Sequence, residues 1–282
     1  MITRNAMQLK AFIKKKAQEY NVSAQLVMQN YMLERLLERI SLSKYKHNFV
    51  IKGGFLISSI LGLNIRATMD LDTTVKGVTL SRESIINIFK EISLINIDDN
   101  ICFELKNVDN IRKDDEYLGL RVFLLANYPP ISFPLTVDVT TGDNITPKEI
   151  EYSYPLLFDD RSIEIIAYNL ENILAEKLET ILSRGIANTR SRDFYDVYVI
   201  TKLRWDSIDF DALKKALLST LKSRHAEIVI NDVESKLLEI EKNSNMNTLW
   251  DNFKKKYTYA ENISFKETID SVKRVLNNLF FQ

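Results

Sequence analysis

The spacing of apolar residues divides the chain into a mixed first part and a helical second part. From about Thr3 to Ser43, apolar residues recur at helical spacing, which predicts two helices with Ser23 as the N-cap of the second. Short runs rich in β-branched residues then predict strands. These runs cover residues 49–51, 69–75, 101–108, 117–127 and 132–140. Helical spacing also occurs at 55–61 and 82–92, so we expect a mixed sheet packed by helices.

From about residue 162 the chain is almost entirely helical, after one short strand at 163–168 that can still belong to the sheet. We place a domain boundary near residue 160. The predicted fold is α+β, with an N-terminal domain at 1–160 built on the mixed β-sheet and a helical C-terminal domain at 161–282. In the second predicted helix, Glu34-Arg35 and Glu38-Arg39 are expected to form a solvated face with i,i+4 pairing.

Composition and charge exclude several classes of protein. The 282 residues are 45% hydrophobic and 27% charged, as in ordinary globular proteins. Basic and acidic residues number 38 each, so an RNA partner would need local basic patches. Cys102 is the only cysteine, which excludes an internal disulfide. The sequence has no apolar run of membrane-spanning length and no signal-peptide pattern, so we expect a cytoplasmic protein without membrane contact.

Two aspartates separated by one residue are the first candidates for chemistry. Asp70 and Asp72 lie in an apolar, β-branched run. On an extended strand, residues two apart project from the same face roughly 6–7 Å apart. Carboxylates this close repel each other unless a cation lies between them, and Mg²⁺ (or Mn²⁺) prefers such oxygen ligands. A pair of this kind is also common on a solvated strand face, so both interpretations stay open.

Gly53 and Gly54 lie between a predicted strand and a predicted helix. A glycine pair there frees backbone N–H groups to point at an anion, and the helix N-terminus adds partial positive charge, so a triphosphate could bind. A tight turn without a ligand is the alternative. Asp138, in the β-branched run at 132–140, is either an edge residue facing water or a third carboxylate. In the latter case it would hold a second metal ion or activate an acceptor hydroxyl.

Charged residues also occur on the predicted helices of the second part. Lys177 shares a helix face with apolar residues, so it points partly inward, either in a structural ion pair or as a phosphate ligand. Arg190 carries a guanidinium, which suits bidentate contact with phosphate. Asp193 and Asp196 share one helix face and can position Lys177 or Arg192 instead of touching a substrate.

The order of these motifs resembles known proteins. Gly-Gly followed by Asp-x-Asp resembles the polymerase-β-type nucleotidyltransferase superfamily, although that superfamily often has Ser where Gly54 stands. Over residues 52–200 the chain resembles the AbiEii/AbiGii nucleotidyltransferase toxin family, whose last motif often has Lys where Arg192 stands. The motifs are Gly-Gly…Arg-x-Thr-x-Asp-Leu-Asp ending at Asp72, Asp-Val-x-x-Gly at 138–142, Ala-Glu-Lys-Leu at 175–178 and Arg-x-Arg-Asp-x-Tyr-Asp at 190–196.

The resemblance implies a Mg²⁺-dependent nucleotidyltransferase toxin of a bacterial toxin–antitoxin or phage abortive-infection system, with the helical domain completing the active-site cleft. An NTP is the expected co-substrate, with GTP and CTP as candidates. The expected acceptor is the 3′ end of tRNA, and the expected partner is an antitoxin encoded alongside. The implied metal ligands are Asp70, Asp72 and Asp138; the implied nucleotide ligands are Gly53, Gly54, Arg66, Thr68, Lys177 and Arg190; Lys177, Asp193 and Asp196 join the three metal ligands as catalytic residues.

A second class of function uses the same residues. A catalytically silent module could hold GTP or another NTP as a signal, and a related transferase could modify a protein instead of RNA. Release of pyrophosphate in the presence of RNA distinguishes an enzyme from a binding module. The basic clusters at 214–215, 222–225 and 254–256 are either solvated faces or contacts for the phosphates of tRNA.

Overall fold

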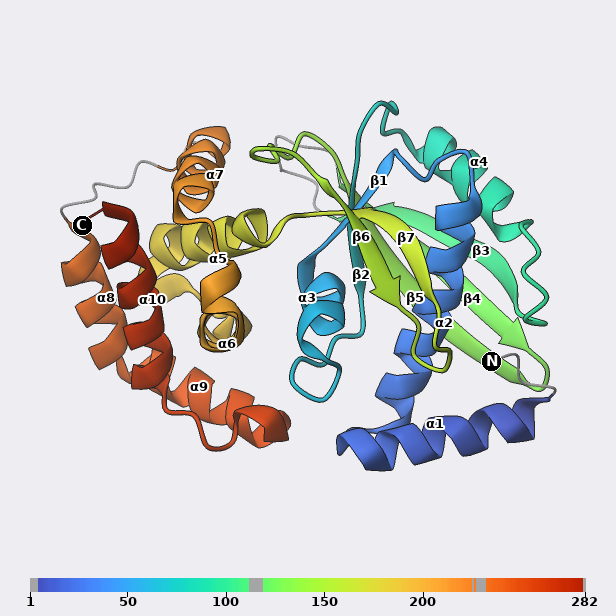
Figure 1. Cartoon of the computed structure of the whole chain (residues 1–282), viewed down its shortest axis with the longest axis horizontal. Coiled ribbons are helices and arrows are strands. Elements are labelled where there is room, and N and C mark those ends of the chain that lie inside the picture. The colour runs from blue at the N-terminus through green and yellow to red at the C-terminus, as the bar shows by residue number, and fades with distance from the viewer. Residues whose placement is uncertain (1–4, 112–118, 225, 227–231, 281–282) are drawn as a thin grey trace. The chain divides into compact units, whose positions relative to one another are not determined.

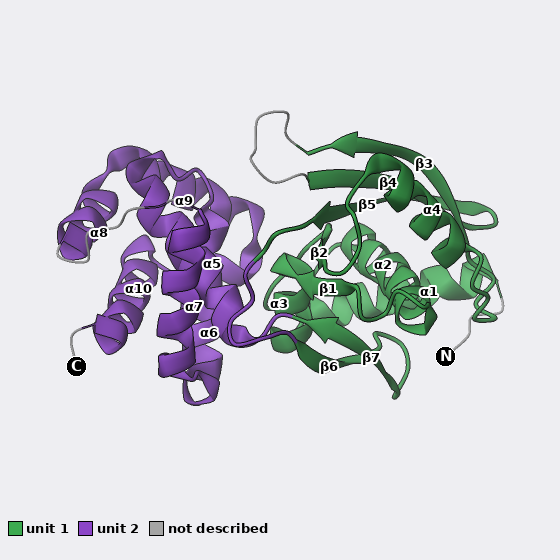
Figure 2. Cartoon of the chain, turned by 90° about the horizontal axis from the view of Figure 1, so that it is seen from above, with its two compact units in different colours: residues 1–143, 150–167 green, residues 144–149, 168–282 purple. Residues whose placement is uncertain are grey.

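The computed structural model describes residues 5–111, 119–224, 226 and 232–280, and Figure 1 shows its elements. The chain divides into two compact units, which Figure 2 colours separately. Unit 1 comprises residues 1–143 and 150–167, and unit 2 comprises 144–149 and 168–282. The expected boundary near residue 160 differs from this division, because the strand that follows it pairs with the sheet of unit 1.

Unit 1 is built on a seven-stranded mixed sheet in the order β3-β4-β5-β2-β1-β7-β6. The strands are β1 (Phe49–Lys52), β2 (Leu71–Val75), β3 (Cys102–Asn110), β4 (Gly119–Tyr128), β5 (Ile131–Thr140), β6 (Ile150–Pro155) and β7 (Ser162–Ala167). β2 runs parallel to β5 and β1 runs parallel to β7, while the other neighbours are antiparallel. The sheet confirms the predicted α+β class. The expected start of β4 at Tyr117 lies outside the described residues.

Sequence reasoning missed β6. Tyr154 is the buried residue of this strand, and the rest of the segment is exposed or half-buried. A strand with so little buried surface has no clear alternation of apolar and polar residues, which is the signal that marks the other strands. Its assignment depends on pairing with β7.

The described residues of unit 1 form four helices: α1 (Ala6–Tyr20), α2 (Ala24–Leu42), α3 (Gly53–Leu61) and α4 (Arg82–Ser93). α2 and α4 pack against each other and against the sheet, whereas α3 follows β1 directly and packs on β1 and β2 (Figure 1). Ser23 caps α2 as predicted, because its Oγ accepts a hydrogen bond from the N–H of Leu26 at 3.1 Å.

The charged run on α2 is buried, so the expectation of a solvated face is wrong. Glu34, Arg35, Glu38 and Arg39 are each 6% exposed or less. Arg35 lies 2.7 Å from Glu34 and 2.6 Å from Glu38, and Arg39 pairs with buried Asp99 at 2.8 Å. Because α1, α4 and the sheet all pack against α2, this helix face is covered, and ion pairing makes the burial of its charges tolerable.

Glu34, a member of this buried cluster, is expected to make the stability of the protein depend on pH. Burial raises the pKa of Glu34 from 4.5 to about 7, against the lowering influence of Arg35 and of the N–H of Leu157. The folded protein therefore holds this proton more tightly than the unfolded chain does. The free energy of unfolding should fall as the pH rises from about 4.5 to 7, by roughly 3 kcal/mol in all.

The variant Glu34→Gln tests this contribution, because glutamine keeps an oxygen that can accept the Leu157 N–H. We expect it to lose the fall in stability between pH 4.5 and 8, measured by urea unfolding followed by circular dichroism. Glu19→Gln, at an exposed position of α1, should behave as the unmodified protein does. Equal pH dependence in Glu34→Gln and the unmodified protein would contradict the titration of Glu34.

Unit 2 is helical, as predicted. Its helices are α5 (Leu170–Arg184), α6 (Ser191–Arg204), α7 (Phe210–Ser223), α8 (Val233–Lys242), α9 (Ser244–Lys256) and α10 (Phe265–Phe280). α5 packs on α6 and α7, and α6 packs on α10. Asn172 ties the segment 144–149 to α5, since its side chain accepts from the N–H of Thr146 at 3.0 Å and donates to the carbonyl of Thr146 at 2.6 Å. Among the described helices of both units, none has the length and apolar character needed to cross a membrane.

Candidate functional site

Four charged residues form a row across adjacent strands of unit 1, here called the charged row. The strand register pairs Lys52 of β1 with Asp72 of β2, Asp72 with Asp138 of β5, and Asp138 with Arg121 of β4. Residues in register on neighbouring strands project from the same face of a sheet, with Cβ atoms about 5 Å apart. The sheet thus brings Asp72 and Asp138 together and flanks them with two cations that sequence reasoning did not select.

Arg121 is hydrogen-bonded to one of these aspartates. Its Nε donates to Oδ1 of Asp138 at 2.8 Å and its Nη2 donates to Oδ2 at 2.7 Å. These hydrogen bonds raise the pKa of Arg121, and the charges of Asp138, Asp70 and Asp72 raise it further. The three aspartates proposed as metal ligands therefore act on one guanidinium.

Asp70 differs from the other two aspartates in its setting. It lies just before β2 and is exposed, whereas Asp72 is the second residue of that strand and is half-buried. Of the two aspartates, Asp72 lies within β2 and Asp70 immediately precedes it, and the charges of both act on Arg121. An exposed aspartate at the start of a strand has more conformational freedom than one within it.

The N-terminus of α3 lies against Asp72. Gly53 has a φ of 68°, in the left-handed region, and a Cβ built there would lie 2.1 Å from Oδ2 of Asp72. A Cβ at Gly54 would lie 2.8 Å from Oγ1 of Thr68 and 3.0 Å from Nη2 of Arg66. Both glycines are required by close approach, and the turn places a helix N-terminus, which favours anions, beside the charged row.

Arg66 and Thr68, which the family resemblance assigns to the nucleotide, are buried behind this turn. They are 1% and 4% exposed. Nη1 of Arg66 donates to the carbonyl of Ala67 at 2.5 Å, and Asn30 donates to the carbonyl of Thr68 at 2.8 Å. In this structure the two side chains support the backbone of Gly54 rather than face solvent.

Lys52, at the other end of the charged row, pairs with Asp143. Its Nζ lies 2.5 Å from Oδ2 of Asp143, which also accepts from Oγ1 of Thr140 at 3.1 Å. Burial acts to raise the pKa of Asp143, but the charge of Lys52 and the hydrogen bonds from Lys52, Thr74 and Thr140 together hold it below its usual value. Asp143 is the last residue of unit 1 before the segment 144–149, so this pair fixes the chain to β1 at the point where it leaves that unit.

In unit 2 the structure brings together Lys177, Asp193 and Asp196. Nζ of Lys177 lies 2.7 Å from Oδ1 of Asp193 and 3.0 Å from Oδ2 of Asp196. The side chains are 18%, 5% and 0% exposed, respectively. Lys177 therefore forms the structural ion pair that the sequence left as one of its two interpretations. Arg190, the residue before α6, is exposed.

The carboxylates of the charged row are suitable ligands for a divalent cation, although in this structure they contact other groups of the protein. Among the residues that the structure describes, no three His, Cys, Asp or Glu side chains are placed to hold a metal ion together. Both oxygens of Asp138 accept from Arg121, and Asp72 lies against Gly53. Carboxylates on adjacent strands beside a helix N-terminus are nevertheless the ligands that Mg²⁺ uses together with substrate phosphates.

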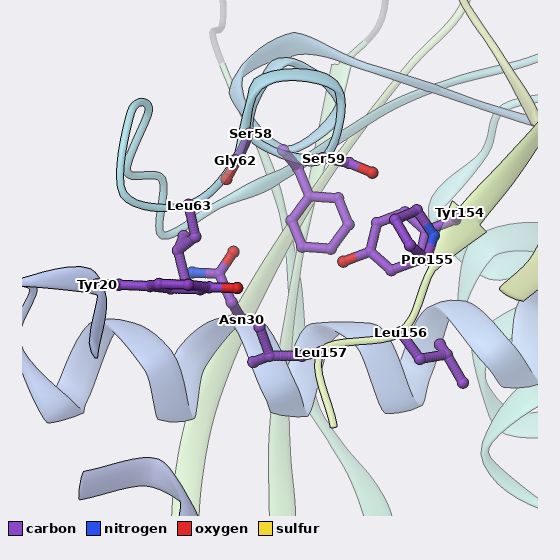
Figure 3. A pocket seen from close by; sticks show the side chains of 11 residues that line it. Tyr20, Asn30, Ser58, Ser59, Gly62, Leu63, Tyr154, Pro155, Leu156 and Leu157 are labelled. Carbon is purple, nitrogen blue, oxygen red and sulfur yellow. The ribbon is translucent and has the colours of Figure 1, made fainter. Parts of the chain in front are cut away.

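A separate cavity of about 160 Å³ lies beside the second half of α3 (Figure 3). Its lining includes Tyr20, Asn30, Ser58, Ser59 and Tyr154. None of its lining residues is charged. It therefore does not suit the phosphates of a nucleotide, which need cations or free N–H groups.

The comparison with protein families assigns the chain to the class of nucleotidyltransferases. The family model for the "Nucleotidyl transferase AbiEii toxin, Type IV TA system" matches residues 35–276, and the chain belongs to this family. No curated protein sequence matches the chain.

Two solved structures from Helicobacter pylori match most of the chain. One, described as a candidate nucleotidyltransferase, has 15% sequence identity and a TM-score of 0.50, with 92% of this chain and 96% of that chain covered. The other, JHP933, has 16% identity and a TM-score of 0.49, with coverage of 91% and 92%. At this identity the first likeness bears on the fold alone, and it agrees with the α+β architecture.

Proposed function

We propose that the protein is a toxin that transfers a nucleoside monophosphate from an NTP to the 3′ end of tRNA, with Mg²⁺ (or Mn²⁺) as cofactor. The observation that carries the proposal is the register of Asp72 with Asp138 beside the N-terminus of α3. Paired carboxylates suit a divalent cation and a helix N-terminus suits phosphate. Membership of a Type IV TA toxin family supports the toxic role and a cognate antitoxin as partner.

The proposed reaction is an in-line displacement at the α-phosphorus of the NTP. The acceptor 3′ oxygen forms a bond to this phosphorus, the α–β phosphoanhydride bond breaks, and pyrophosphate leaves. A bound divalent cation would neutralise charge on the phosphates. Asp70 and Asp72 would hold it, the N–H groups of Gly53 and Gly54 would bind the triphosphate, and Asp138 would hold a second cation or accept the proton of the acceptor hydroxyl.

The proposal includes four residues of unit 2. Lys177, Asp193 and Asp196 are polar residues required for activity, and exposed Arg190 is a phosphate ligand. Guanidinium and ammonium groups both bind phosphate, the former in bidentate fashion. GTP and CTP are the candidate donors, and the reaction takes place in the cytoplasm, where NTPs and tRNA occur together.

A labelling experiment tests the proposal. Purified protein is incubated with total tRNA, Mg²⁺ and each of the four α-³²P-labelled NTPs, beside Asp70→Ala and the surface control Asp160→Ala. With one of the four labelled NTPs, we expect the reactions of the unmodified protein and of Asp160→Ala to give a labelled tRNA band. The reaction of Asp70→Ala should give none. Growth arrest on expression should follow the same pattern, because transfer is the proposed toxic act.

Other outcomes contradict separate parts of the proposal. Bound nucleotide without label on any RNA would favour a silent NTP-binding module, and label on protein would favour a protein acceptor. Full labelling by Asp70→Ala would contradict the assignment of Asp70 to the metal. Growth arrest by an Asp70→Ala variant that no longer labels RNA would separate toxicity from transfer.

A further inference from the structure

Arg121 holds both oxygens of a candidate catalytic carboxylate. It lies in β4, directly opposite Asp138 in the antiparallel pairing with β5, and its two hydrogen bonds to Asp138 are 2.8 and 2.7 Å long. A bidentate pair of this kind fixes the orientation of the carboxylate as well as its charge. In this state the orientation of Asp138 is set by Arg121.

The charge of Arg121 acts on more than its direct partner. Asp72 lies in register with Asp138 on the adjacent strand β2, and Asp70 precedes it by two residues, so all three carboxylates belong to the same part of the sheet. Like charges at this spacing repel one another, so carboxylates gathered on one face of a sheet need a cation nearby. Arg121 meets that need in a protein without a bound metal ion.

The exposed fractions of the Arg121 and Asp138 side chains indicate which of the two can change its conformation more easily. The side chain of Arg121 is 43% exposed, whereas that of Asp138 is 16% exposed. A guanidinium on a long, half-exposed side chain can change rotamer into solvent more easily than a largely covered carboxylate on a central strand can. A divalent cation approaching the carboxylates would repel the guanidinium and compete for the same oxygens.

We propose that Arg121 is a positioning residue that neutralises Asp70, Asp72 and Asp138 in the metal-free protein, releases Asp138 when a divalent cation arrives with the nucleotide, and then pairs with a phosphate of that nucleotide. The proposal rests on the proposed function for the identity of the ligands. A merely structural cross-strand pair is the alternative. Such a pair would stabilise the sheet without affecting metal affinity.

Direct binding measurements test the proposal without relying on activity. Mn²⁺ affinity is measured by electron paramagnetic resonance in the absence of nucleotide, for the unmodified protein, Arg121→Met and Arg121→Lys. We expect Arg121→Met to bind Mn²⁺ about tenfold more tightly, because a competing charge close to the site is removed. Arg121→Lys keeps the charge but loses the bidentate geometry, so its affinity should lie between the two.

Nucleotide binding supplies the second half of the test. Calorimetry with a non-hydrolysable NTP analogue and Mg²⁺ should show about tenfold weaker binding to Arg121→Met, because a phosphate contact is lost. Asp138→Asn removes the carboxylate for which the two cations compete. In that background, Arg121→Met should change Mn²⁺ affinity less than it does in the unmodified protein.

Two results would overturn the proposal. One is unchanged Mn²⁺ affinity in an Arg121→Met protein that circular dichroism shows to be folded, and the other is unchanged affinity of this folded variant for the NTP analogue with Mg²⁺. Failure of the proposed function gives a different pattern. If the affinities shift as expected but no RNA is labelled, the role of Arg121 stands and the assignment of the acceptor fails.

Discussion

Gly53→Ala is expected to reduce nucleotidyl transfer about 1000-fold while unit 1 stays folded. The added Cβ would lie 2.1 Å from Oδ2 of Asp72, so this carboxylate must move away from the charged row. A shift of about 1 Å at a reacting group costs on the order of 100-fold, and displacing the neighbouring N–H groups adds about a further tenfold. Initial rates of labelled transfer at saturating NTP, together with circular dichroism, measure the effect.

Gly77→Ala is the matched control for backbone strain. Gly77 has a φ of 70°, close to the 68° of Gly53, but a Cβ there meets Nδ2 of Asn48 at 3.3 Å and no carboxylate. Both substitutions place alanine in the left-handed region at a cost of about 1–2 kcal/mol. We expect Gly77→Ala to be slightly destabilised and fully active. Equal loss of activity in the two variants would assign the effect to strain, and an active Gly53→Ala would contradict the role of the turn.

The elements of the fold could be predicted where one local pattern determined them. The helix predicted at residues 82–92 and the strands predicted at 101–108 and 132–140 agree with the observed bounds to within a few residues. Each buries apolar residues on one face, and the spacing of these residues in the sequence indicates the element. The charged run of α2 could not be interpreted in this way. Glu34 and Arg39 are buried because other elements cover a face that is polar in sequence, and that covering is a property of tertiary packing.

In the charged row, the two aspartates could be selected from the sequence, but the two cations, Lys52 and Arg121, could not. Asp72 and Asp138 stand out as charges inside β-branched runs. Arg121 alternates with buried Leu120 and Val122 along β4, so its position reads as an ordinary solvent-facing one. Its role appears only when β4 is placed beside β5, and β5 beside β2, an order that joins strands distant in the sequence.

The family resemblance assigns roles to residues by their place in a motif, but it does not indicate whether their side chains are buried. The family pattern assigned Arg66 and Thr68 to the nucleotide, yet both are buried against the Gly-Gly turn. A buried arginine and threonine beside two glycines can matter to the site by shaping the backbone that meets the ligand. The sequence contains both side chains, but their burial follows from the close packing of α3 on β2.

Lys177→Met is expected to lower the free energy of unfolding of unit 2 by about 3–5 kcal/mol, because it leaves two buried carboxylates without their cation. Asp193 and Asp196 have side chains that are 5% and 0% exposed, at 2.7 and 3.0 Å from the ammonium group. Both tryptophans of the chain, Trp205 and Trp250, lie in unit 2. Intrinsic tryptophan fluorescence during urea unfolding therefore reports on this unit.

Two further variants separate the structural role of Lys177 from its proposed role at the nucleotide. Lys215→Met, at an exposed position of α7, should change stability by less than about 0.5 kcal/mol. In Lys177→Met/Asp193→Asn/Asp196→Asn the unpaired charges are gone, so most of the stability should return. We expect this triple variant to remain inactive, since it lacks the ammonium group for the phosphates and both aspartates that are proposed to be required for activity. Recovery of transfer together with stability would mean that Lys177 acts only through its ion pairs.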